Sequence, residues 1–140
     1  MLPIKIISTG FYTPGESISN SELISLTGLE FKTEKLENKL GVFNRHMAHI
    51  RDIAETTADF ATKAALNAIA DAGITSNEID LFIVGTDTPE YISPATSILV
   101  QGRIQKAESW SSTFDVNASC ASFTIALDNA ARIMATDATI

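Results

Sequence analysis

Apolar positions along the chain follow two spacings, and the change from one to the other divides it into segments. Short, nearly continuous apolar runs are typical of buried strands, whereas apolar residues three and four apart indicate amphipathic helices. The longest helical pattern ends at Gly73, a residue type well suited to the position after a helix. We predict strands over 4–10, 79–86 and 112–116, and helices over 21–27, 30–39, 52–72, 94–105 and 120–135.

Residues at two of the predicted helix starts have capping character. Ser19 and Asn20 offer an N-cap to the helix over 21–27, and Ser93 before Pro94 places a capping residue ahead of a proline at the first helical position. The alternation of strands and helices predicts an α/β fold with a mostly parallel sheet and right-handed crossover helices. The last predicted element is a helix, so we expect the sheet layer to be incomplete at the C-terminus.

Composition narrows the class of protein. The 140 residues are 45% hydrophobic and 19% charged, which fits one globular domain or part of a larger one. The net charge of −7 comes without a basic cluster, so we expect no nucleic-acid partner. The start lacks the build of a signal peptide and no apolar run is long enough for a membrane span, so we expect a cytoplasmic protein with no membrane partner.

Cys120 is the main candidate for chemistry. It is the only cysteine, which excludes an internal disulfide, and it lies where a predicted strand passes into a predicted helix. Groups beyond the carboxyl end of a parallel strand commonly form active sites. A thiol at a helix N-terminus faces the positive end of the dipole, which favours the nucleophilic thiolate. Taken without its neighbours, the same cysteine fits a small buried hydrophobe.

Other patterns argue against a metal or a nucleotide. His46 and His49 have a spacing that a metal on a helix could use, but without a second cysteine or a suitably spaced carboxylate we expect a structural role for both. We therefore predict no metal site. The glycines form neither a dinucleotide-binding nor a phosphate-loop pattern, so we predict no nucleotide cofactor. These glycines are Gly10, Gly15, Gly85 and Gly102.

Four segments together resemble one known family. Residues 115–127, Asp-Val-Asn-Ala-Ser-Cys-Ala-Ser-Phe-Thr-Ile-Ala-Leu, resemble the nucleophile segment of the β-ketoacyl-acyl-carrier-protein synthase III family, in the thiolase superfamily. Residues 41–46 resemble its Gly-Ile-x-x-Arg-His segment, 6–14 its opening strand and turn, and 70–81 its helix-to-strand junction. The resemblance implies that 1–140 is the N-terminal, partial half of a duplicated thiolase-like fold, with the C-terminal half absent.

The resemblance also implies an activity. The family's cysteine, here Cys120, accepts an acyl group from acyl-CoA or an acyl carrier protein. Malonyl on acyl carrier protein then loses carbon dioxide and condenses with it, in fatty-acid or polyketide synthesis, without a resident cofactor. The histidine and asparagine of this second step lie in the family's C-terminal half, so we expect this chain alone to be inactive in condensation. We also expect a homodimer that forms through the edge strand at 113–116.

Three positions depart from the family pattern. Lys39 stands where the family has an arginine that holds CoA, and it could attract a phosphate as a point charge without arginine's planar fork. Lys35 stands in place of a tryptophan that stacks on adenine. Ser93 stands where some relatives have a phenylalanine that limits the acyl pocket, so we predict that a longer acyl chain is accepted.

Two alternative functions remain open. A condensing enzyme like hydroxymethylglutaryl-CoA synthase has an acidic general base after a Val-Gly-Thr segment, and here Asp87 follows Val84-Gly85-Thr86. The residues around Cys120 fit the ketoacyl synthase better. A non-catalytic thiolase-like subunit is the other alternative, although such subunits often lack the cysteine.

Overall fold

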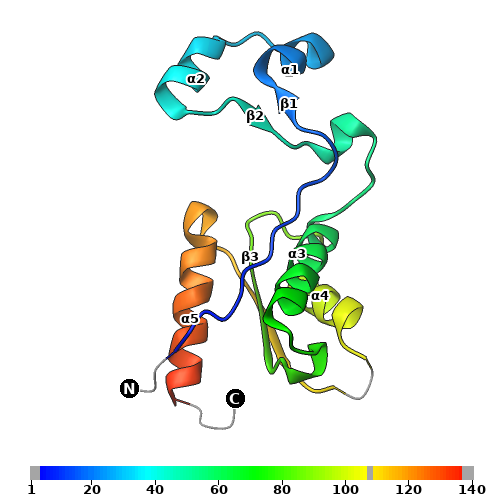
Figure 1. Ribbon diagram of the computed structural model, residues 1–140, viewed down its shortest axis with the longest axis vertical. Coiled ribbons are helices and arrows are strands. Elements are labelled where there is room, and N and C mark those ends of the chain that lie inside the picture. The colour runs from blue at the N-terminus through cyan, green and yellow to red at the C-terminus, as the bar shows by residue number, and fades with distance from the viewer. Residues whose placement is uncertain (1–3, 107–108, 137–140) are drawn as a thin grey trace. The chain divides into compact units, whose positions relative to one another are not determined.

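The computed structural model describes residues 4–106 and 109–136, and the chain divides into two compact units that we describe separately (Figure 1). The larger unit comprises Met1–Tyr12 and Thr56–Ile140, and the smaller one Thr13–Glu55. The larger unit holds α3 (Thr57–Ala72), β3 (Leu81–Gly85), α4 (Thr96–Ile104), β4 (Ser112–Val116) and α5 (Ser122–Thr136). The smaller unit holds β1 (Ile18–Ser19), α1 (Asn20–Thr27), α2 (Thr33–Leu40) and β2 (Asn44–Arg45).

The smaller unit is organised around the side chain of Asn20. Its amide donates to Glu37 Oε1 at 2.8 Å and to the Val42 carbonyl at 2.9 Å, and its oxygen accepts from Arg45. These bonds connect α1, α2 and β2. Both predicted helices are present, and Ser19 caps α1 by accepting from the Glu22 N–H. The short antiparallel pair β1–β2 was not predicted, because two-residue strands leave no periodic pattern.

The larger unit is a two-stranded parallel sheet with helices on both faces. The pairing of β3 with β4 runs in register from Leu81 opposite Ser112 to Gly85 opposite Val116. Helices α3 and α4 lie on one side of the strands and α5 on the other (Figure 1). Alternate residues of β3 point to opposite faces, so that Phe82 joins the core formed with α3 and α4, whereas Ile83 faces α5. The predicted α/β class with parallel pairing is confirmed.

The long predicted helix over 52–72 begins later than its apolar pattern suggested. Residues Ala48–Arg51 form a separate 3₁₀ turn, and Asp52 ends it in the left-handed conformation with φ of 54°. Helix α3 then starts with a capping box, in which Thr56 and Asp59 bond to each other's backbone N–H. The amphipathic pattern alone did not reveal this break, because Ile53 and Ala54 continue it.

The predicted strand over 4–10 does not form. A strand needs a neighbour that shares its hydrogen-bond ladder, but this segment lies along α3. The Ser8 hydroxyl donates to the Ala68 carbonyl at 2.8 Å, and Asn67 Nδ2 donates to the Phe11 carbonyl at 2.9 Å. At Gly10 a Cβ would overlap the backbone of α3, so only glycine permits this approach. The apolar side chains Ile6 and Ile7 remain exposed.

Candidate active site

Cys120 lies at the junction where strand β4 passes into helix α5. Strand β4 ends at Val116, and a 3₁₀ turn over Ser119–Ala121 carries the cysteine into the first turn of α5. The thiol is free and exposed, beyond the carboxyl end of the parallel pair. The alternative interpretation of Cys120, a small buried hydrophobe, is wrong because the residue is exposed. A reactant can therefore reach the sulfur without opening the core.

The turn around Cys120 has an unusual backbone. Ser119 has φ of 49°, in the left-handed region that residues other than glycine rarely adopt. The first N–H groups of a helix have no partner within it, and within the part of the chain that the structure describes the Cys120 N–H donates no hydrogen bond. This N–H is therefore available to a negative oxygen that develops beside the thiol.

Ser122, to which the sequence analysis assigned no role, supports this turn through its hydroxyl. Its side chain is buried, with 5% of the residue exposed. The hydroxyl accepts from the Ala118 N–H at 2.9 Å and donates to the Ser119 carbonyl at 2.7 Å. A serine in the first turn of a predicted helix is a common signal for local capping, but the pattern did not indicate which groups it would bond.

Gly85 allows the turn to approach the sheet closely. It is the last residue of β3, and a Cβ built on it would lie 2.8 Å from the Ser122 carbonyl carbon and 3.0 Å from the Phe123 nitrogen. Contacts that short are not tolerated, so a larger residue would push the start of α5 away from β3. The absent side chain of Gly85 therefore sets how closely the cysteine turn approaches the strand.

Asp115 connects the cysteine segment to helix α4. Its carboxylate, on β4, accepts from the Thr96 N–H at 2.7 Å and from the Ser97 N–H at 2.8 Å, the first amides of α4. Negative charge at a helix N-terminus is stabilised by the dipole and by the unpaired N–H groups. The predicted cap at Ser93 with helical Pro94 is wrong, since α4 begins at Thr96 and its capping group comes from a strand.

Charged groups form a bridge on the outer side of α4. Arg103 lies 3.2 Å from Asp59 on α3 and 4.0 Å from Glu90 in the loop before α4. The backbone N–H of Thr56 is the main cause that lowers the pKa of Asp59, followed by the Thr56 hydroxyl and the positive charges of Arg103 and Lys63. These contacts help to hold the loop that follows β3.

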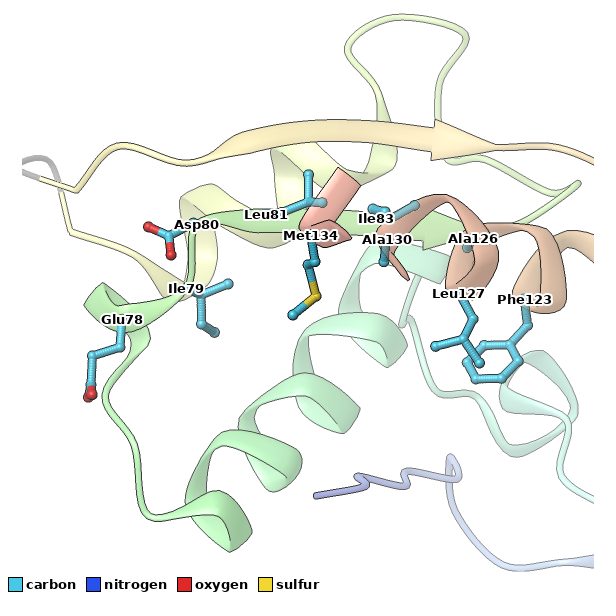
Figure 2. A pocket seen from close by; sticks show the side chains of 11 residues that line it. Glu78, Ile79, Asp80, Leu81, Ile83, Phe123, Ala126, Leu127, Ala130 and Met134 are labelled. Atoms are coloured by element: carbon cyan, nitrogen blue, oxygen red, sulfur yellow. The ribbon is translucent and has the colours of Figure 1, made fainter. Parts of the chain in front are cut away.

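An apolar groove of about 450 Å³ runs beside the cysteine turn between β3 and α5 (Figure 2). Phe123 and Leu127 project into it at the end near the turn, and Glu78 and Asp80 lie at the other end (Figure 2). The Thr75 backbone N–H and hydroxyl lower the pKa of Glu78, one of the two acidic side chains at that end. The remaining lining residues are Ile79, Leu81, Ile83, Gly85, Ala126, Ala130 and Met134.

The other substrate-site and general-base candidates of the sequence analysis lie in two other segments of the chain. Lys39 is exposed in the last turn of α2, in the smaller unit, where its charge complements the helix dipole. Ser93 and Asp87 are exposed in the loop between β3 and α4. The roles expected of all three stay predictions.

The histidines lie in the smaller unit. His46 Nδ1 is 3.0 Å from the Gly15 carbonyl, and His49 is in the 3₁₀ turn before Asp52. Among residues 4–106 and 109–136, no three His, Cys, Asp or Glu side chains are placed to hold a metal ion. Within the same ranges, no helix combines the length and the apolar character needed to cross a bilayer.

Curated relatives share one name. The chain is 34% identical over 131 residues to β-ketoacyl-[acyl-carrier-protein] synthase III of Clostridium tetani, with 94% of this chain and 37% of that protein covered. It is 38% identical over 122 residues to the protein of the same name from Wolbachia pipientis, with 87% and 36% covered. The chain thus spans less than two fifths of the length of these relatives. No family model matches it.

Solved structures show the same similarity in three dimensions. The 3-oxoacyl-[acyl-carrier-protein] synthase III from Aquifex aeolicus superposes with a TM-score of 0.80 at 32% identity, over 94% of this chain and 40% of that one. A tetronic acid condensing enzyme also gives 0.80, at 25% identity and with the same coverage. The expected fold, part of a thiolase-like α/β architecture, is confirmed.

Proposed function

On the premise that this chain is homologous to the amino-terminal part of the β-ketoacyl-[acyl-carrier-protein] synthase III family, we propose that Cys120 accepts an acyl group from an acyl thioester. The observation that supports this most directly is the free, exposed thiol in the turn beyond β4, in a fold shared with condensing enzymes. The coarser function, a condensing acyltransferase, rests on the relatives and their structures.

The proposed first step is a transfer between two thioesters. The Cys120 sulfur attacks the carbonyl carbon of the donor, and the carbonyl oxygen becomes negative while a new C–S bond forms. The donor's C–S bond then breaks, and the departing thiolate takes up the proton that the Cys120 thiol gave up on attack. The Cys120 N–H can donate to the oxygen, and one such donor contributes about 3–4 kcal/mol in comparable sites. A covalent intermediate divides one difficult condensation into two easier reactions.

The proposed second step belongs to the full-length gene product. Malonyl on acyl carrier protein loses carbon dioxide, and the carbanion attacks the acyl group on Cys120 to give a 3-oxoacyl product. The resemblance assigns this step to a histidine and an asparagine that match no residue of this chain. The engagement of His46 with the Gly15 carbonyl is consistent with a structural role. We propose no resident cofactor, because thiol and thioester chemistry needs none.

Substrate and partner proposals follow from individual positions. Lys39 binds a phosphate of CoA, or an acyl group arrives on a carrier protein instead. Ser93, which is exposed in the loop before α4, permits a longer acyl chain. Two copies pair through the edge of β4 that does not face β3. The alternatives, a hydroxymethylglutaryl-CoA synthase-like reaction through Asp87 or a non-catalytic subunit, have no comparable support, since the curated relatives cited above carry the ketoacyl synthase name.

The test is the intact mass of the full-length gene product, before and after incubation with a panel of acyl-CoAs and acyl carrier proteins. We expect the mass to rise by one acyl group. Cys120→Ser should abolish the gain, while Ser109→Ala, which removes a hydroxyl that donates to Asn77 outside the turn, should retain it. A parent protein that gains no acyl group from any donor would refute the acyl-acceptor role and favour a non-catalytic subunit.

A further inference from the structure

The hydroxyl of Ser122 uses both its hydrogen-bonding functions on the turn that carries Cys120. It accepts from the Ala118 N–H and donates to the Ser119 carbonyl, at 2.9 and 2.7 Å. A hydroxyl has one proton to donate, so these two bonds determine its direction. Because the side chain is buried, with 5% of the residue exposed, solvent has little access to the oxygen.

The bond to Ser119 acts on the peptide group that also contains the Cys120 N–H. A trans peptide is planar, and its carbonyl and N–H point in opposite directions. When Ser122 holds the Ser119 carbonyl, it therefore also sets the direction of the Cys120 N–H. That N–H is the proposed donor to the thioester oxygen, and it makes no other hydrogen bond within the described chain.

The backbone at Ser119 needs such support. Its φ of 49° lies in a region that residues other than glycine disfavour, and such a conformation persists only where surrounding contacts impose it. Ser122 holds groups on both sides of this residue, the Ala118 N–H before it and the Ser119 carbonyl after it. The Ser122 backbone N–H also donates to the Ser119 carbonyl, so losing the hydroxyl removes one of two donors to that oxygen together with the bond from the Ala118 N–H, and the peptide plane is then held less firmly.

Ser122 is itself fixed against the sheet. The end of β3 meets its backbone so closely that a Cβ on Gly85 would lie 2.8 Å from the Ser122 carbonyl carbon. Through its hydroxyl, Ser122 therefore fixes the cysteine turn relative to β3. Support by a rigid element is what a precise catalytic geometry requires.

We infer that Ser122 is a positioning residue, whose hydroxyl orients the Ser119–Cys120 peptide so that the Cys120 N–H meets the acyl oxygen. This inference rests on the proposed function of Cys120. Ser122 does not touch the substrate, and its effect should therefore appear in the rate of acyl transfer and not in the affinity for the donor.

The experiment compares Ser122→Ala with Thr124→Ala in the full-length gene product. Thr124 is exposed on the same helix, so its variant removes a hydroxyl that lies outside the turn. We measure the single-turnover rate of acylation by an acyl-CoA and, separately, the alkylation of Cys120 by iodoacetamide. Alkylation develops no negative oxygen, so its rate reports the reactivity of the Cys120 thiol independently of the Cys120 N–H.

We expect Ser122→Ala to slow the maximal rate of acylation by about tenfold, a fraction of the effect of losing a whole oxyanion donor. The half-saturating acyl-CoA concentration and the alkylation rate should stay within about threefold of the parent. Thr124→Ala should change none of the three. Ser119→Gly added to Ser122→Ala should recover several-fold in rate, because glycine adopts a positive φ without strain.

Three outcomes separate the inference from its premise. Acylation of Ser122→Ala within twofold of the parent would overturn the inference while the acyl-acceptor function stands. An equal loss in acylation and alkylation, without recovery in the double variant, would also overturn it, since a general collapse of the turn explains that result. A parent that is alkylated but never acylated would refute the proposed function itself.

Discussion

The two faces of the β3–β4 sheet are covered by amphipathic helices, yet only one face is closed. On the side of α3 and α4, Ala58 and Val100 are 0% and 2% exposed and enclose Phe82. On the side of α5, Phe123 is 74% exposed and Leu127 is 45% exposed, and both line an open groove (Figure 2). The apolar pattern is of the same kind on both sides.

The difference teaches what an amphipathic pattern can and cannot predict. Spacing identifies which side of a helix is apolar, because the helical period places those residues together. Burial also requires a second surface at the right distance. Helix α4 packs against α3 as well as β3 and β4, whereas in the described chain α5 packs mainly against β3, β4 and the 3₁₀ turn that leads into it. A large exposed apolar surface of this kind marks a place where further chain or a partner can bind.

The largest expected effect comes from truncating one phenylalanine on each face. Phe82→Ala should lower the free energy of unfolding by about 3–5 kcal/mol, because it leaves a cavity in the closed core. Phe123→Ala should change it by less than about 0.5 kcal/mol in the 140-residue chain, because the side chain is mostly in water. Urea unfolding followed by circular dichroism measures both, and equal losses would contradict the difference between the faces.

The same pair in the full-length gene product sharpens the comparison. A cost for Phe123→Ala that rises toward that of Phe82→Ala would mean that further chain closes the groove. An unchanged small cost would leave the groove open to a ligand or a partner.

Two glycines provide a second, smaller contrast. Gly85→Ala should destabilise the protein by about 1–3 kcal/mol, because its Cβ would overlap the backbone at Ser122. Gly102→Ala, in α4 with open space around the new Cβ, should stabilise it by about 0.5–1 kcal/mol through helix propensity. Thermal unfolding should therefore move the two midpoints in opposite directions. A Gly85→Ala protein as stable as the parent would refute the close approach of α5 to β3.

The smallest expected effect concerns pH at the start of α3. The folded protein lowers the pKa of Asp59, mainly through the Thr56 N–H, so its carboxylate contributes stability above the unfolded value of about 3.9. That contribution is lost as the pH falls from there through the lowered folded value. Because the side chain is a third exposed, we expect less than about 1 kcal/mol.

The measurement is the difference in unfolding free energy between the parent and Asp59→Asn, at pH 6 and near pH 3. The difference should shrink at the lower pH, where the parent carboxylate takes up a proton. Asp128→Asn is the matched control, since Asp128 is exposed on α5 and pairs only with Arg132 among the described residues. A difference that grows at low pH would reverse the sign and refute the capping role.

The sequence by itself determined the elements with strong local signals. An apolar run located β3, helical spacing located α3 and α5, and Gly73 marked the end of α3. It also located Cys120 at the strand-to-helix junction. These features depend on residues within one or two turns of each other, so the pattern contains what is needed to predict them.

Only the tertiary structure decided which residues surround that cysteine. Asp115, which caps α4, lies on β4 and nineteen positions after Thr96. Gly85, which lets the start of α5 approach the sheet, lies on β3. The segment at 4–10 has the pattern of a strand but lies along α3. In each case the determining contact joins residues distant in sequence, and burial, capping and pairing all require a partner that local spacing does not specify.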